Sequence, residues 1–239
     1  MQLETVRSHL IKCRCSGGRK VTENSCSGVG GMRKGEETRR EIIQKAAPIF
    51  NQKGFEGASL SDLMRATGLE KGGIYRHFES KQQLAAEAFD YAWKTAMDRR
   101  MAGTEEISDS VDRLKQIVRN FRERREGLVP GGCPLLNTAI DSDDGNVLLR
   151  GKAKRALNGL LDRLEAIAAV GQERNEIKRD VDAKDLATLI VSTLEGSLML
   201  RRLQKDEAPL ALACRTLETY LEEKVRFTPC LEDPRNACL

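Results

Sequence analysis

The residues best suited to binding chemistry lie close together, between positions 71 and 81. This stretch carries the hydrogen-bond donors Lys71, Tyr75, Arg76, His77 and Lys81. Lysine ammonium groups bind phosphates, which orients a protein on a nucleic acid, whereas tyrosine, arginine and histidine can reach base edges. Gly72 and Gly73 leave room for backbone N–H groups to approach a phosphate closely. The stretch therefore predicts contact with a nucleic acid, although a structural hydrogen-bonding role fits His77 equally well.

The sequence around this stretch predicts two short helices. Ser59 followed by Asp62 resembles a capping box, with aspartate in place of the usual glutamate. Gly68 should end this first helix, and the second begins at Lys71. Two short helices joined by a tight glycine-containing turn form a helix-turn-helix, whose second helix enters the major groove of DNA. We place the motif from Ser59 to Phe78 and include Ser59 among the expected DNA contacts.

Longer helices are predicted on both sides of the motif. On the N-terminal side, apolar residues recur on one helical face at Ile43, Ala46, Ala47 and Phe50. Gly54 should end that helix, and Pro48 should kink it. On the C-terminal side, Ser80 is placed to cap a helix that runs to about Arg100.

The rest of the chain alternates amphipathic helical stretches with short breaks and shows no alternating strand pattern. Alanine and leucine are abundant and aromatic residues make up only 4%, which favours helix. We therefore predict an all-α protein. Hydrophobic residues at 40% and charged residues at 32% are typical of a soluble globular protein. The formal net charge of +4 allows an anionic partner without requiring one.

The first 33 residues differ in composition from the rest of the chain. They are rich in glycine and serine and show no helical period after about Ile11. We interpret residues 1–33 as a disordered extension, with Met32 as an alternative start.

The composition also bears on metals, membranes and location. The cysteines Cys13, Cys15 and Cys26, with His9, match no closed zinc site well, so we predict no metal and no cofactor. No apolar run is long enough to span a membrane, and no secretory signal is recognisable. We therefore expect a cytoplasmic protein without a membrane partner.

The N-terminal half of the chain resembles the TetR/AcrR family of bacterial transcriptional regulators. The matching residues are Thr38-Arg39, Ile42, Ala46-Ala47, Phe50, Gly54-Phe55, Ser59–Leu63, Gly68-Leu69, Lys71-Gly72, Ile74-Tyr75, His77-Phe78 and Ser80-Lys81. Two residues depart from the pattern. Glu70 stands where the family often has a serine or threonine cap, and Pro48 falls inside the first helix.

The resemblance implies a division into domains. A three-helix DNA-binding domain would span residues 36–96, with a long fourth helix as connector. A larger helical domain at 97–226 would bind a small molecule and dimerise, and a tail would follow at 227–239.

A weaker resemblance covers the C-terminal part. Glu176–Asp182 and Leu194–Leu198 resemble the lead-in and the middle of the family's eighth helix. Apolar residues on more than one side of Leu186–Leu200 independently favour a dimer, because a helix that faces only its own core needs a single stripe. The expected dimer contacts are Leu194, Leu198, Leu217 and Leu221.

The expected ligand contacts are Cys133 and Asn137. Cys133 precedes a proline where a helix should begin, and a helix N-terminus lowers the pKa of a thiol. A thiol-based redox sensor that uses Cys133 on the same scaffold is therefore the alternative, although a packed cysteine is the favoured interpretation. An enzyme is disfavoured, because the chain has only His9 and His77 to serve a nucleophilic thiol.

The sequence thus predicts a ligand-responsive repressor that binds a palindromic operator in double-stranded DNA as a homodimer. An unknown small-molecule effector would favour a conformation with wrongly spaced recognition helices, and the helix from Ser80 to about Arg100 would transmit the change. An interaction protein whose helix-turn-helix binds another protein is a further alternative.

Overall fold

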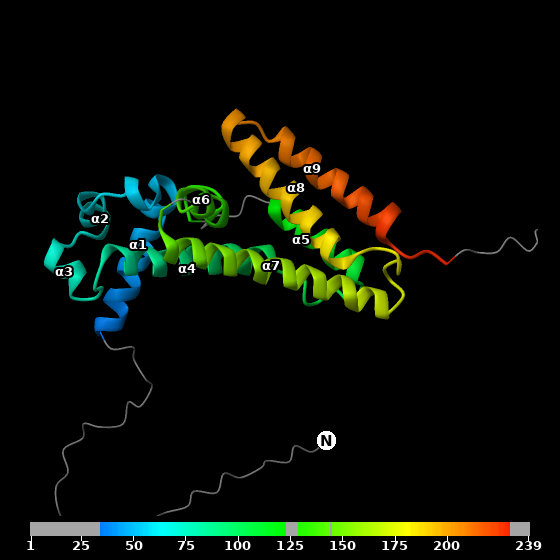
Figure 1. The fold of residues 1–239 in the computed structure, drawn as a ribbon, viewed down its shortest axis with the longest axis horizontal. Coiled ribbons are helices and arrows are strands. Elements are labelled where there is room, and N and C mark those ends of the chain that lie inside the picture. Colours follow the sequence, from blue (N-terminus) through cyan, green and yellow to red (C-terminus); the bar gives the residue numbers. More distant parts are fainter. Residues whose placement is uncertain (1–33, 123–128, 144, 230–239) are drawn as a thin grey trace, which may run out of the picture. The chain divides into compact units, whose positions relative to one another are not determined.

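Figure 1 shows the fold in a computed structural model, which describes residues 34–122, 129–143 and 145–229. Within these ranges the regular secondary structure is helical, apart from one isolated antiparallel bridge between Ile177 and Arg226. The all-α prediction is confirmed. The extension predicted at 1–33, with Cys13, Cys15 and Cys26, lies outside the described residues, as do positions 230–239 of the predicted tail.

The helices follow one another along the described ranges. In chain order they are α1 (Lys34–Gly57), α2 (Leu60–Thr67), α3 (Lys71–Tyr75), α4 (Lys81–Arg100), α5 (Ser110–Arg122), α6 (Pro134–Asp141), α7 (Val147–Glu173), α8 (Ala183–Gln204), α9 (Ala208–Tyr220) and the π-helical turn η1 (Leu221–Val225). The predicted helix-turn-helix corresponds to α2 and α3. The domain boundary predicted at 96/97 falls inside α4. None of the helices in the described ranges is long and apolar enough to cross a membrane.

A small apolar core holds α1 to α4 together. Its buried members come from these helices and from the turn after α3: Ile42, Ala46, Leu63, Ile74, Phe78 and Leu84. Burying a large apolar side chain stabilises a fold by about 1.5–3 kcal/mol. An isolated helix as short as α3 is not stable in water, so this packing is what keeps it helical.

The helix ends follow local sequence signals. Ser59 and Asp62 form a complete capping box at the start of α2, and the side chain of Ser80 accepts a hydrogen bond from the backbone of Gln83 at the start of α4. Gly68 ends α2 in the left-handed conformation, at φ 73°. In α1 the backbone departs from helical angles at Gly54 (φ 73°, ψ 176°) rather than at Pro48.

A larger core joins α5, α7, α8, α9 and η1. Its most deeply buried side chains include Val111, Leu114, Ile117, Leu160, Leu164, Ile190, Leu194, Leu210, Leu217 and Leu221. This packing corrects the predicted dimer contacts. Leu194, Leu217 and Leu221 are at most 3% exposed in a single chain, so they have no surface to offer a second copy. Leu198 is half-buried and packs against the same core.

The last described segment closes this core by pairing with the chain before α8. Lys178 donates its backbone N–H to the carbonyl of Val225 at 3.0 Å, and Phe227 donates to the carbonyl of Glu176 at 2.8 Å. Arg226 forms ion pairs with Asp109 and with carboxylates on α5 and η1. The last described segment is thereby fixed to the first helix of the larger core.

Candidate functional site

The turn between α2 and α3 is defined by local hydrogen bonds and by two buried anchors. The N–H of Gly68 donates to the carbonyl of Met64 at 2.8 Å, which closes α2. Leu63 on α2 and Ile74 on α3 are each 1% exposed and face the small core. The opposite side of α3 therefore faces outward.

The outward side of α3 carries most of the predicted DNA contacts. Lys71, Gly72 and Arg76 are exposed, while Gly73, Tyr75, His77 and Lys81 are half-buried. The structure brings these seven residues together on α3, the turn after it and the start of α4. The side opposite the core thus presents several cations on a short segment, which is the arrangement that phosphate binding requires.

The two glycines of α3 differ in their surroundings. A Cβ added at Gly72 would meet no atom within 4 Å, so the space above it is open to another molecule. A Cβ added at Gly73 would approach the Cβ of Leu69 to 3.3 Å, which is tighter than ordinary contact. Gly73 therefore serves the packing of the turn, and Gly72 is the glycine whose backbone another molecule can approach.

Two other predicted contacts already have structural partners. The Lys81 Nζ lies 4.5 Å from the centre of the Phe55 ring. The hydroxyl of Ser59 accepts from the backbone of Asp62 at 3.1 Å and donates to its carboxylate at 2.8 Å. The Lys53 ammonium and the Ser59 donors hold the pKa of the Asp62 carboxyl well below its usual range. Ser59 is thus primarily a helix cap.

The sequence did not predict a salt bridge that joins α1 to α4. The Arg39 guanidinium forms a two-pronged salt bridge with Glu87, donates to the carbonyl of His77 at 3.3 Å and stacks 4.5 Å from the centre of the Phe78 ring. These contacts place the end of the recognition segment against α1 and α4. Arg39 and Glu87 are 48 positions apart in the sequence, so no local pattern could reveal their salt bridge.

A cavity of about 1110 Å³ lies among α4, the end of α5, α6 and the C-terminal half of α8. Both predicted ligand contacts, Cys133 and Asn137, line it. Phe121, Leu136 and Leu198 contribute apolar wall. The volume is close to the upper end of the range for small-molecule sites, which is about 1,000 Å³.

Two residues that line this cavity, Arg100 and Cys133, belong to a buried polar cluster. Arg100, at the end of α4, donates to the Glu195 carboxylate at 3.0 Å and to the Cys133 sulfur at 3.2 Å. The Cys133 thiol in turn donates to Glu195 at 3.1 Å. The Arg100 guanidinium also lies 4.2 Å from the Phe121 ring centre and 5.3 Å from that of Trp93. Sequence alone gave no signal for the pairing of Arg100 with Glu195.

The surroundings of Cys133 do not favour a reactive thiol. Burial raises the pKa of this thiol to about 11, and the Arg100 charge only partly opposes that effect. A thiol with so high a pKa has little thiolate at neutral pH, and the thiolate is the reactive form. The structure therefore gives no support to the redox alternative.

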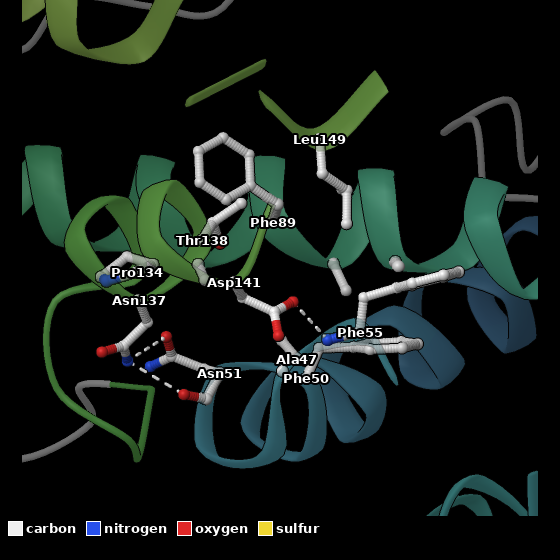
Figure 2. A pocket seen from close by; sticks show the side chains of 14 residues that line it. Ala47, Phe50, Asn51, Phe55, Phe89, Pro134, Asn137, Thr138, Asp141 and Leu149 are labelled. Atoms are coloured by element: carbon white, nitrogen blue, oxygen red, sulfur yellow. Dashed lines mark hydrogen bonds between the residues drawn. The ribbon is translucent and has the colours of Figure 1, made fainter. Parts of the chain in front are cut away.

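A second contact region joins α6 to α1, beside which it lies (Figure 1). Figure 2 shows this region around a small pocket lined by Phe50, Phe55 and Asp141, among others. Asp141 accepts a hydrogen bond from the backbone N–H of Phe55 at 2.7 Å. Asn137 donates to the backbone and side-chain oxygens of Asn51. Helix α6 is thus hydrogen-bonded to the first helix of the DNA-facing part.

Comparisons with known proteins cover both parts of the chain. Residues 42–88 match the family model of bacterial regulatory proteins, tetR family, and residues 110–217 match that of the tetracyclin repressor-like C-terminal domain. A TetR transcriptional regulator from Chloroflexus aurantiacus J-10-FL, known as a crystal structure, is 44% identical, with a TM-score of 0.79 over 82% of this chain and 100% of that chain.

Two further relatives are also similar to most of the chain. A TetR family regulator from Cytophaga hutchinsonii is 32% identical, with a TM-score of 0.78 over 83% of this chain and 100% of that structure. The transcriptional repressor DhaR of Mycobacterium sp. (strain GP1) is 23% identical over 172 residues, which is 72% of this chain and 86% of DhaR.

Proposed function

The chain belongs to the TetR family of bacterial transcriptional regulators, and we propose that it is a ligand-responsive repressor that binds a palindromic operator as a homodimer. Members of this family are DNA-binding regulators and not enzymes.

The observation that carries the proposal is the two-sided character of α3. Ile74 fixes one side in the core, and the other side presents Lys71, Gly72 and Arg76 to solvent. A short helix so anchored can enter the major groove, with its cations on phosphates and Tyr75 and His77 within reach of base edges.

A dimer would place two such helices on one face of DNA. The apolar residues that α8 and α9 leave exposed, away from the cavity, are Leu189, Leu200, Leu212 and Tyr220. We assign the dimer surface to these residues, in place of the buried leucines expected from the sequence. A two-fold axis through α8 and α9 pairs them into a four-helix bundle. Half-sites would then lie about 34–36 Å apart or at a simple extension of that spacing.

Effector binding would affect the DNA-facing part through a loop that contacts both the large cavity and α1. The loop from Val129 to Gly132 lines the large cavity, and its carbonyls accept hydrogen bonds from Asn51 on α1. A ligand that displaces this loop therefore shifts α1. Helix α4 offers the parallel route expected from the sequence. A coupling of about 1–3 kcal/mol is typical of such linkage.

The test is an anisotropy titration of the full chain against its own upstream DNA at several salt concentrations. We expect tight, sequence-selective binding that weakens with salt. Lys71→Ala should weaken binding to all sequences and lower the salt slope by about 1, since one phosphate contact is lost. Lys154→Ala, an exposed lysine of α7, is the matched control and should change neither quantity. Salt-insensitive binding, or equal effects of the two variants, would count against the proposed DNA face.

A further inference from the structure

The charged side chains that line the large cavity are predominantly basic. Five basic side chains and one acidic side chain contribute to its surface: Arg99, Arg100, Arg201, Arg202, Lys205 and Glu207. Concave walls of low dielectric concentrate the field of such groups and raise the local concentration of the opposite charge. The cavity therefore favours an anion over a cation.

The buried member of this set has an unfilled hydrogen-bonding position. Arg100 is 7% exposed, and its Nη1 has no hydrogen-bond partner among the described residues, although its Nη2 is bound to Glu195 and Cys133. An unsatisfied buried donor costs about 1–3 kcal/mol, and more when it is charged. A group that only accepts hydrogen bonds, such as a carboxylate, is the complement of a guanidinium.

Glu195 already competes for that guanidinium, and it is also incompletely satisfied. Its Oε2 is buried without a partner in the described part of the chain, while Oε1 receives both Arg100 and Cys133. The ion pair between Arg100 and Glu195 is therefore only half as well bonded as a two-pronged pair. It is the kind of contact that a second carboxylate can replace.

Two exposed cations lie nearer the surface of the cavity. Arg202 donates to the carbonyl of Gly131 and to the Asn137 side chain, which are neutral acceptors. Lys205 ends α8 in the left-handed conformation, and the described residues place no carboxylate within salt-bridge distance of either cation. Their charge remains available to a ligand.

The same cavity has apolar wall that water would otherwise cover. Ile140, Met199 and Leu203 line it and are 68%, 43% and 74% exposed. Burial of such surface by a ligand contributes roughly 25 cal/mol per Å². A ligand with a hydrocarbon body would cover these side chains.

Resting on the regulator function proposed above, we propose that the effector is an amphipathic organic anion whose carboxylate binds Arg100 in competition with Glu195, with Arg202 and Lys205 attracting it. Its hydrocarbon part covers Ile140, Met199 and Leu203. Because Arg100 ends α4 and Glu195 lies on α8, exchange of the ion pair loosens the link between the connector helix and the helix of the proposed dimer surface.

A head-group series tests the class of ligand directly. Decanoate, decanol and decyltrimethylammonium share one chain length and differ in charge. Calorimetry with the full chain, below the micelle concentration of each probe, should find decanoate at least about tenfold tighter than decanol, a difference of about 1.4 kcal/mol. The cation should bind more weakly than decanol. Equal binding of decanoate and decanol, or preference for the cation, would overturn the proposal.

Variants then locate the carboxylate. Arg100→Gln should remove the preference for decanoate. Glu195→Gln keeps Arg100 and removes its competitor, so decanoate should bind this variant several-fold tighter than it binds the unchanged protein, with decanol unaffected. This second variant keeps the proposal falsifiable if Arg100→Gln does not fold. Arg163→Gln, an exposed arginine of α7, is the control and should retain the unchanged preference. A Glu195→Gln protein with unchanged decanoate affinity would refute the competition.

Operator binding without ligand is measured separately in the salt titration. A chain that binds its operator and prefers decanol keeps the regulator function and loses the anionic effector. A chain that prefers decanoate and ignores DNA keeps the ligand class and loses the regulator function.

Discussion

Asn137 on α6 donates its side-chain amide to both oxygens of Asn51 on α1, the backbone carbonyl at 2.9 Å and the side-chain carbonyl at 3.0 Å. Asn51 in turn donates to the carbonyls of Pro130 and Gly132 at 3.0 and 3.1 Å. Since Asn137, Pro130 and Gly132 also line the large cavity, a single hydrogen-bonded group belongs to both the ligand site and the DNA-facing helices.

Asn137→Ala should therefore affect both stability and coupling. Loss of these hydrogen bonds leaves buried acceptors unpaired, at a cost of about 1–3 kcal/mol in the free energy of unfolding, measured by urea denaturation. The ratio of operator affinities with and without decanoate should fall toward one. Asn158→Ala, at an exposed position on α7, should leave both quantities unchanged. Full coupling in a destabilised Asn137→Ala protein would exclude this route.

Gly72→Ala should weaken operator binding without loss of stability. The new methyl group meets nothing within the chain and occupies the space where we expect DNA. Alanine in a helix gains up to about 1 kcal/mol over glycine, and the operator dissociation constant should rise about tenfold. Gly159→Ala on α7, where a Cβ is equally free, should gain the same stability and leave DNA binding intact. Unchanged affinity in Gly72→Ala would place the DNA elsewhere on the motif.

Cys133 should react with iodoacetamide about a hundredfold more slowly than an ordinary exposed thiol at pH 8, because a pKa of about 11 leaves little thiolate. The rate should rise as the pH approaches 11. The proton is held more tightly in the folded state, so this thiol's contribution to stability is complete below its unfolded pKa and is lost as pH rises from about 8.5 towards 11. Mass spectrometry of the labelled peptide measures the rate, with urea-unfolded protein as reference. Rapid labelling at pH 8 would revive the thiol-sensing alternative.

Leu212→Glu should disrupt the proposed dimer. The side chain is 59% exposed on α9, and a carboxylate there would be buried against its symmetry mate. We expect the dimer dissociation constant to rise at least about tenfold, measured by analytical ultracentrifugation. Val147→Glu, at an apolar position that is 71% exposed on α7, is the matched control. Dissociation of both variants, or of neither, would argue against the α8–α9 surface.

The sequence predicted those features that depend on neighbouring residues. The capping box of Ser59 and the helix end at Gly68 are properties of a few consecutive positions, and the structure confirms both. Which face of a helix is buried cannot be read from neighbouring residues in the same way. Leu194 and Leu200 both belong to the two-sided pattern of α8, yet only packing decides that Leu194 is enclosed and Leu200 is exposed.

The sequence also did not predict polar contacts between residues that are far apart in the chain. Arg100 and Glu195 are 95 positions apart, and each alone resembles an ordinary surface charge. Only the fold shows that Arg100 lines the large cavity and that Glu195 is buried against it. The same holds for Asn51, which has no distinguishing pattern in α1 and is nevertheless the residue that receives Asn137.

The pairing of residues 176–178 with 225–227 has a consequence for the order of synthesis. The core of the helix-turn-helix part draws on residues between Ile42 and Leu84, whereas the larger core runs from Val111 to Val225. Domains fold in the order in which they emerge during translation. The DNA-facing part can thus be complete while the ribosome is still adding the segment that closes the larger core. A nascent chain would therefore have a folded helix-turn-helix part before the core that we expect to regulate it is complete.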